Sequence, residues 1–173
     1  MPAPQNLGFE AVGGGPGHAS GWYTRGRFSA EEVLGFGPTV VTGPLAAPND
    51  LADASWTPFF ATITTNVAAD PDGAVTADRI EETVAVDTHG VRSTATYPLV
   101  AGRSYGVSAW VKDVTRGYAG VGFGSTVGGQ VAFAIVDLAT GRVTSYVTGG
   151  NFARVSACVQ ELGSTGWYLV DVA

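Results

Sequence analysis

Aromatic side chains flanked by polar ones are the residues with the clearest chemical use in this chain. From Tyr105 to Lys112 apolar residues alternate with others, so a strand there places Trp110 on one face with Ser108 and Lys112. An exposed aromatic ring can stack on the C–H face of a sugar while neighbouring polar groups hold the sugar hydroxyls. The candidate carbohydrate-binding residues are Trp110, Ser108, Lys112, Tyr118 and Tyr146.

The same aromatic residues have a structural alternative. Trp110, Trp167 and Tyr168 are large amphipathic groups of the kind that fill the space between two packed sheets. Whether Trp110 points outward or into a contact cannot be read from its spacing, so both interpretations stay open.

Catalytic chemistry has few candidate groups. The histidines are His18 and His89, and no Gly-x-Ser-x-Gly elbow accompanies them. We expect His89 in a turn before a strand at Val91. Glycoside hydrolysis requires two carboxyl groups that face each other, whereas adjacent Glu81 and Glu82 point to opposite faces of a strand and are expected at a solvated strand end. The sequence therefore predicts no catalytic residue.

Metal binding has one candidate group. Asp70, Asp72 and Asp78 offer oxygen ligands for a structural calcium ion, but they lack the Asp-x-Asp-x-Asp-Gly spacing of a calcium loop. Turn chemistry explains Asp72 without a metal. We therefore predict no cofactor and no metal site, with structural calcium as the alternative.

Charge and composition restrict the partners. The 173 residues include 9 basic and 15 acidic ones, a formal charge of -6, so attraction to nucleic acid or to anionic lipid is not expected. No segment approaches the roughly 20 apolar residues of a membrane span, and no secretory signal is visible. The single cysteine, Cys158, excludes an intrachain disulfide and is expected to be a structural thiol.

The elements that must position these residues are strands. The 25 glycines and 9 prolines interrupt the apolar sequence too often for a helical bundle, and β-branched and aromatic runs recur at sandwich-like intervals from Leu51 onward. Turns are expected at Pro71-Asp72-Gly73 and at Ala139 to Arg142. The predicted strands are Ala61 to Val67, Thr76 to Glu82, Val91 to Tyr97, Tyr105 to Lys112, Tyr118 to Phe123, Val131 to Asp137, Val143 to Thr148, Phe152 to Gln160 and Trp167 to Val172.

The first fifty residues differ from the rest. Asn6 to Tyr23 is rich in glycine and reads as an extended arm. Ser29 to Glu32 fits a capping box and predicts a short helix over Ala30 to Leu34, followed by a linker over Gly43 to Asp50. We therefore predict an N-terminal arm over residues 1–50 and a domain over residues 51–173, and we expect the domain to fold without the arm.

Several motifs of the domain follow one another in a familiar order. They are Trp56-Thr57, Asp70-Pro71-Asp72-Gly73, Thr76 to Glu82, Val100 to Tyr105, Ser108 to Lys112, Val136 to Val143 and Gly163 to Tyr168. In this order they resemble the jelly-roll, carbohydrate-binding-module-like domains of tail, fibre and spike proteins of tailed bacteriophages. The resemblance implies an all-β, two-layer antiparallel β-sandwich of jelly-roll type.

The resemblance also implies a function. It suggests a non-enzymatic virion protein of a fibre, spike, tail or capsid, assembled in the host cytoplasm and forming a homo-oligomer. Such a domain would attach to a polysaccharide of the host surface, and the arm would dock it to other virion proteins. The docking residues that the arm suggests are Asn6, Phe9, Glu10 and Trp22.

Two alternatives remain open. The chain could be a glycan-binding module of a secreted polysaccharide-degrading enzyme, or a hydrolase that degrades capsule.

One departure from the family pattern suggests an interface. Family members usually continue with another strand or two after the Gly-Trp-Tyr motif, whereas this sequence ends at Asp171-Val172-Ala173. Either the sequence is one piece of a longer product, or a segment of a neighbouring subunit completes the sandwich. An uncovered strand edge exposes unpaired backbone groups. We therefore expect the last strand or the N-terminal arm to lie in an intersubunit contact.

Overall fold

The computed structural model describes most of the chain from residue 47 onward and short pieces before it. The described residues are 8–9, 21–25, 30–33, 38–39, 47, 49–85, 87–96, 104–124, 130–150, 152 and 155–173. Within these ranges the secondary structure consists of strands and contains no helix. The described part of the protein is therefore all-β, and every strand pair in it is antiparallel.

All the predicted strands are present, with small differences at their ends. Strand β8 is shorter than predicted, and β13 begins five residues later than predicted. The strands are β1 (Gly8–Phe9), β2 (Gly21–Arg25), β3 (Ala30–Val33), β4 (Pro38–Thr39), β5 (Trp56–Phe59), β6 (Ala61–Ala69), β7 (Val75–Glu82), β8 (Gly90–Ser93), β9 (Ser104–Asp113), β10 (Tyr118–Gly124), β11 (Val131–Asp137), β12 (Arg142–Gly149), β13 (Ala157–Glu161) and β14 (Trp167–Val172).

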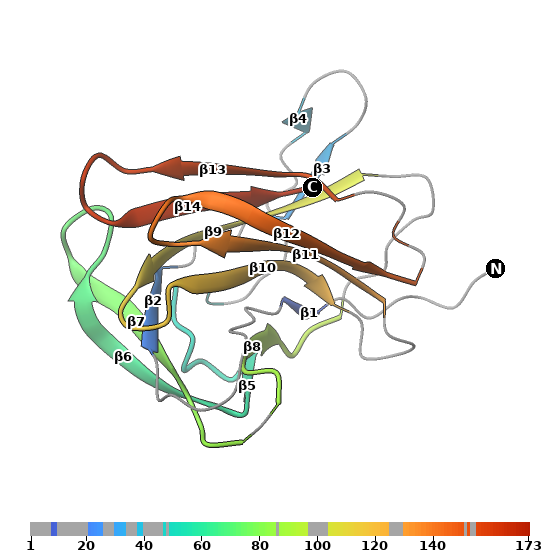
Figure 1. The fold of residues 1–173 in the computed structure, drawn as a ribbon. Coiled ribbons are helices and arrows are strands. Elements are labelled where there is room, and N and C mark those ends of the chain that lie inside the picture. The colour runs from blue at the N-terminus through green and yellow to red at the C-terminus, as the bar shows by residue number, and fades with distance from the viewer. Residues whose placement is uncertain are drawn as a thin grey trace.

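The strands form a smaller and a larger sheet and one separate pair. The smaller sheet has the order β1-β10-β11-β12, and the larger has the order β13-β14-β9-β2-β7-β6, with β3 beside β9 and β4 beside β3. The pair β5-β8 lies below β10 in Figure 1, near β6 and β7.

The two sheets share one hydrophobic core. On β9 the side chains of Val107, Ala109 and Val111 are buried, while the residues between them are partly exposed. They join a single cluster with apolar side chains of β10, β11 and β14, including Val121 and Val136. Burying each such side chain contributes about 2 kcal/mol, so this shared core is the main reason that the two sheets stay together.

Two glycines make the predicted turns. Gly73 has a φ of +88°, and Gly141, in the turn between β11 and β12, has a φ of +65°. A Cβ atom on Gly141 would lie 2.6 Å from Cε1 of Tyr168, so the glycine also allows this tyrosine to reach the core. The sequence predicted both turns correctly.

The described parts of residues 1–50 differ from the predicted arm. Strand β2 lies inside the larger sheet, with Tyr23 opposite both Arg79 of β7 and Lys112 of β9. The predicted helix over Ala30 to Leu34 is replaced by β3, which pairs with β9. A capping box favours a helix only locally, whereas the ladder along β9 supplies backbone hydrogen bonds from a distant segment. These strands therefore belong to the same sheet as residues 51–173.

The last strand is also placed differently from the prediction. Strand β14 lies between β13 and β9, so both of its edges are paired within the chain. The last strand therefore has no open edge of the kind expected, and the intersubunit contact of the last strand or the N-terminal arm stays a prediction.

We predict that deleting residues 1–50 prevents folding, because it removes β2 and leaves the facing edges of β7 and β9 without their shared neighbour. Circular dichroism during thermal unfolding measures this directly. A cooperative unfolding transition of the fragment 51–173, similar to that of the full chain, would contradict the prediction.

Asp78, on β7, connects that strand by hydrogen bonds to Leu51 and to an irregular segment of β6. Its carboxylate accepts a hydrogen bond of 2.7 Å from the amide of Leu51 and one of 3.1 Å from the amide of Asn66. Asn66 has a φ of +55° at the irregularity between Thr64 and Ala68. Burial raises the pKa of Asp78 above its usual 3.8, although both amide hydrogen bonds act to lower it.

This pKa shift predicts a pH-dependent stability. Because the folded protein holds the proton of Asp78 more tightly than the unfolded chain does, this group stabilises the fold most below about pH 4, and its contribution declines as the pH rises through the raised pKa. Asp78→Asn removes this titration. Urea unfolding at several pH values should therefore show that the difference in unfolding free energy, wild type minus Asp78→Asn, falls as the pH rises from about 4. A difference that grows with pH would contradict the assignment.

Candidate functional site

The outer face of the larger sheet carries the main predicted site residues. Strands β9 and β14 place Ser108 opposite Asp171, and Trp110 opposite Leu169. Because neighbouring residues of a strand point to opposite faces, these side chains lie on the side away from Val107, Ala109 and Val111. Trp110 is partly exposed to solvent.

The polar neighbours of Trp110 are held in place by the protein itself. The Ser108 hydroxyl donates a hydrogen bond to the Asp171 carboxylate. The ammonium group of Lys112 donates to the carbonyl oxygen of Thr165 at 2.7 Å and lies 5.9 Å from the ring centre of Trp167. These contacts reduce the freedom of both polar side chains before any ligand arrives.

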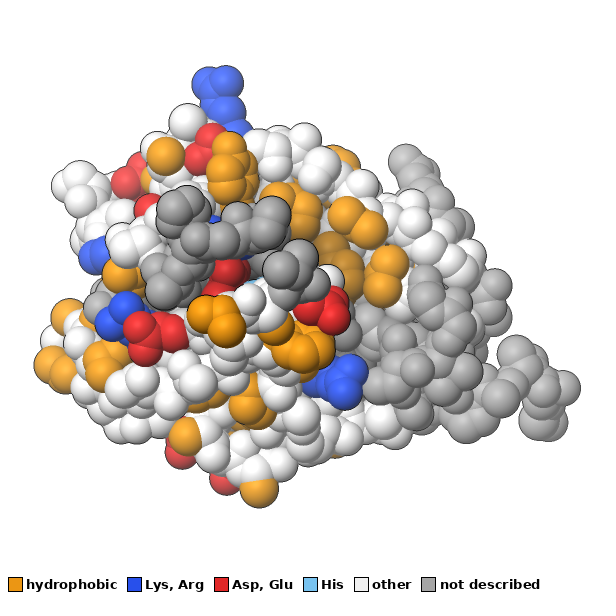
Figure 2. Space-filling view, turned by 60° about the horizontal axis from the view of Figure 1, so that its bottom comes forward, with side chains coloured by type: hydrophobic (Ala, Val, Ile, Leu, Met, Phe, Trp, Pro, Cys, Tyr) orange, Lys and Arg blue, Asp and Glu red, His pale blue; other side chains and the backbone are white. Residues whose placement is uncertain are grey.

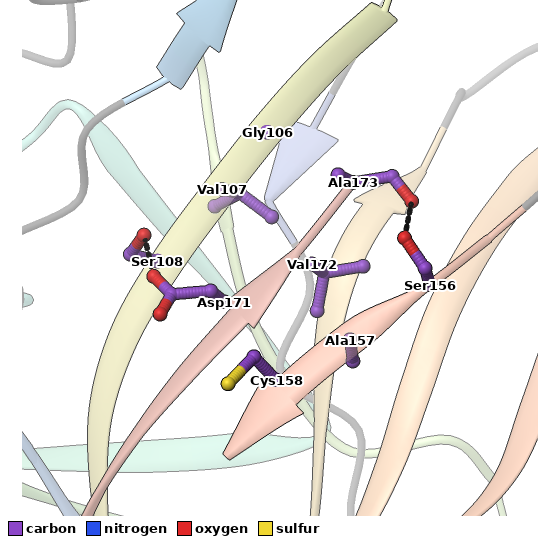
Figure 3. Close-up of a pocket in the computed structure, with 9 residues that line it drawn as sticks. All are labelled: Gly106, Val107, Ser108, Ser156, Ala157, Cys158, Asp171, Val172 and Ala173. Atoms are coloured by element: carbon purple, nitrogen blue, oxygen red, sulfur yellow. Dashed lines mark hydrogen bonds between the residues drawn. The ribbon is translucent and has the colours of Figure 1, made fainter. Parts of the chain in front are cut away.

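A shallow hollow of about 430 Å³ adjoins this row. Figure 3 shows Ser108 and Asp171 directed toward each other across β9 and β14, and Ser156 directed toward the carbonyl oxygen of Ala173. The exposed thiol of Cys158 also lines the hollow, so the expectation of a structural thiol is not met. The hollow therefore offers a carboxylate and two hydroxyl groups, and Trp110 follows one of its lining residues, Ser108, by two positions on the same face of β9.

The other two candidate tyrosines lie elsewhere. Tyr118, with 45% of its surface exposed, begins β10, and Tyr146, with 48% exposed, lies on β12. Both strands belong to the smaller sheet. The structure thus brings Trp110, Ser108 and Lys112 together but places neither tyrosine with them.

The predicted docking residues are only partly described. Phe9 lies in β1 opposite Phe123, and Trp22 lies in β2 opposite Ile80 and Asp113. Asn6, Glu10 and His18 lie outside the described residues.

A buried charged cluster was not predicted from the sequence. Oε2 of Glu82 lies 3.0 Å from Nη1 of Arg116 and 3.9 Å from Nδ1 of His89, and all three side chains are more than nine-tenths buried. Glu81, as predicted, points away from Glu82, and it pairs at 2.6 Å with partly exposed Arg79. The solvated strand end expected for Glu82 is therefore wrong, although His89 precedes β8 as predicted.

The role of this cluster follows from the segments it joins. Glu82 ends β7, His89 directly precedes β8, and Arg116 belongs to the turn between β9 and β10. One carboxylate thus connects three loops at this end of the molecule. The signal in the sequence was that Glu82 shares a strand face with Ile80, which is a core residue.

Two of the aspartates considered for calcium, Asp70 and Asp78, accept hydrogen bonds from protein groups. The Asp70 carboxylate accepts hydrogen bonds from the amides of Asp72 and Ala74, at 2.8 and 3.1 Å, and from the hydroxyl of Thr76. The Asp78 carboxylate accepts hydrogen bonds from the backbone amides of Leu51 and Asn66. In the part of the chain that is described, no group of three or more His, Cys, Asp or Glu could hold a metal ion.

Comparison of the chain with known protein families, curated proteins and solved structures found no match. Within the described ranges, the search for a helix long and apolar enough to cross a membrane also found none.

We predict that Glu82→Ala lowers the unfolding free energy by about 3 kcal/mol, because it removes the buried carboxylate that lies 3.0 Å from the buried guanidinium group of Arg116. Glu81→Ala is the matched control, since it removes a neighbouring carboxylate from a partly exposed pair and should cost less than about 1 kcal/mol. Urea unfolding of both variants tests this. Equal losses would show that the cluster adds no special stability.

Proposed function

We propose that this protein is a non-enzymatic binding module that attaches to a polysaccharide through the outer face of its larger sheet. The observation that supports this most directly is that partly exposed Trp110 follows Ser108 by two positions on one face of β9, and that Ser108, Asp171 and Ser156 line a hollow at that face. A sugar ring stacked on Trp110 would have carboxylate and hydroxyl groups within reach of its own hydroxyls.

The proposal extends to the kind of protein. The order of motifs supports a jelly-roll β-sandwich of the type displayed by tailed-bacteriophage virions, and the antiparallel sheets around one core fit that architecture. In this proposal the protein is a fibre, spike, tail or capsid component that attaches to host surface polysaccharide. The N-terminal fifty residues join it to other virion proteins.

Binding is favoured over hydrolysis by the charges of the hollow. Glycoside hydrolysis requires two carboxyl groups about 5 to 9.5 Å apart. Among the lining residues that the structure describes, only Asp171 carries a carboxylate side chain, and it accepts a hydrogen bond from Ser108. This arrangement suits recognition of hydroxyl groups.

We predict that Trp110→Ala weakens polysaccharide binding by about thirtyfold, which corresponds to about 2 kcal/mol for loss of a central aromatic anchor. Tyr118→Ala is the matched control, because Tyr118 is an exposed aromatic residue on the other sheet. A glycan array followed by titration of the best ligand measures both effects.

Three results would overturn the proposal. They are the absence of any bound glycan on the array, equal binding by wild type and Trp110→Ala, and the release of new reducing ends from the bound polysaccharide. The last result would identify a hydrolase instead.

A further inference from the structure

Strand β12 is an exposed edge with an unusual composition. It ends the smaller sheet, so one side pairs with β11 and no described strand pairs with the other (Figure 1). Residues 143–148 read Val-Thr-Ser-Tyr-Val-Thr, which favour strands strongly and include no charge, proline or glycine. Tyr146 and Val147 are 48% and 43% exposed. Proteins usually protect such an edge with lysine, proline or a bulge. In β12 a register shift lies near the start of the strand, between the Val136–Val143 and Ile135–Ser145 pairs, and the residues from Ser145 to Gly149 pair regularly after it.

The ladder shows which backbone groups of β12 point outward. The amide of Leu138 donates to the carbonyl of Gly117, one step beyond the pair of Tyr118 and Asp137. Bonded and non-bonded pairs alternate in an antiparallel ladder, so Ile135 and Phe133 direct their backbone groups toward β12.

The same alternation applies to β12 itself. Ser145 and Val147, the partners of Ile135 and Phe133, bond to β11. Tyr146 and Thr148 therefore direct their N–H and C=O groups away from the sheet. Thr144 is the extra residue at the register shift, and its hydroxyl donates to the carbonyl oxygen of Ile135 at 3.2 Å.

We infer that this edge pairs with the β12 edge of a second copy of the chain. In an antiparallel pair related by a two-fold axis at Tyr146, the outward N–H and C=O groups of Tyr146 meet those of Tyr146 in the second copy. The pairing places the two Tyr146 side chains opposite each other and brings Thr148 beside the irregular segment at Thr144 of the second copy. Aromatic pairs are among the favourable cross-strand contacts.

The identity of the partner follows from this self-complementarity. Arg142 is the only charged residue of β12. In the proposed dimer the two copies of Arg142 lie at opposite ends of the paired segment, so their positive charges do not meet. Once paired, both edges are used, so the assembly closes as a dimer and does not extend into a fibre. Figure 2 shows that apolar side chains on the face turned forward lie in several small groups, some of them beside charged side chains.

The first test compares two lysine substitutions by analytical ultracentrifugation of the full chain. Tyr146→Lys places two ammonium groups opposite each other and should weaken the dimer at least about tenfold. Tyr118→Lys is the control, because Tyr118 is similarly exposed, at 45%, and belongs to the same sheet but lies on β10, not on the edge strand β12. Circular dichroism establishes that both variants are folded.

The second test measures the register by disulfide formation and does not depend on the lysine variants. In a Cys158→Ser background, Tyr146→Cys should form a disulfide-linked dimer on mild oxidation, because a bonded antiparallel pair separates the Cα atoms by about 5.5 Å. Thr148→Cys is the control, since its two copies would lie four residues apart along the strand, or about 13 Å.

The inference is supported if the wild type and Tyr118→Lys are dimers, Tyr146→Lys dissociates, and only Tyr146→Cys becomes cross-linked. A wild-type chain that stays monomeric overturns it, as does a dimer that tolerates Tyr146→Lys or a cross-link that forms only at position 148. None of these results depends on polysaccharide binding, so the proposed function is judged separately.

Discussion

The alternation of side chains along β9 is the constraint on which the rest of the structure depends. One face supplies Val107, Ala109 and Val111 to the core, and the other face carries Ser108 and Trp110 outward. The packing that holds the two sheets together therefore also fixes the direction of the candidate binding residues. A shift of the register of β9 by one residue would bury the polar face and expose the core.

The nine predicted strands and the split of β9 into two faces followed from local patterns, because period-two alternation and turn glycines act over a few residues. The same reasoning correctly separated Glu81 from Glu82. It failed for Ala30–Val33, since the partner of that segment, β9, lies more than seventy positions further along the chain. Pairing over such a distance is decided by the whole sheet and leaves little trace in the segment itself.

The candidate site was predictable to a similar extent. Trp110, Ser108 and Lys112 share a face because they belong to one strand, so their spacing was sufficient. Asp171 and Ser156 join them only through the pairing of β13, β14 and β9, which no local pattern records. Tyr118 and Tyr146 were grouped with the site because they are aromatic, although their strands belong to the other sheet.

The positions of the site and the proposed dimer edge have a consequence for binding. Trp110 lies on β9, which is paired along both sides, so its backbone is held more firmly than that of an edge strand. Strand β12 belongs to the other sheet, so pairing through it leaves the outer face around Trp110 open. A dimer of this kind would carry two sugar sites on one rigid body. Because a polysaccharide repeats its units, the second site would then bind at a high effective concentration, and weak contacts at each Trp110 would suffice for firm attachment.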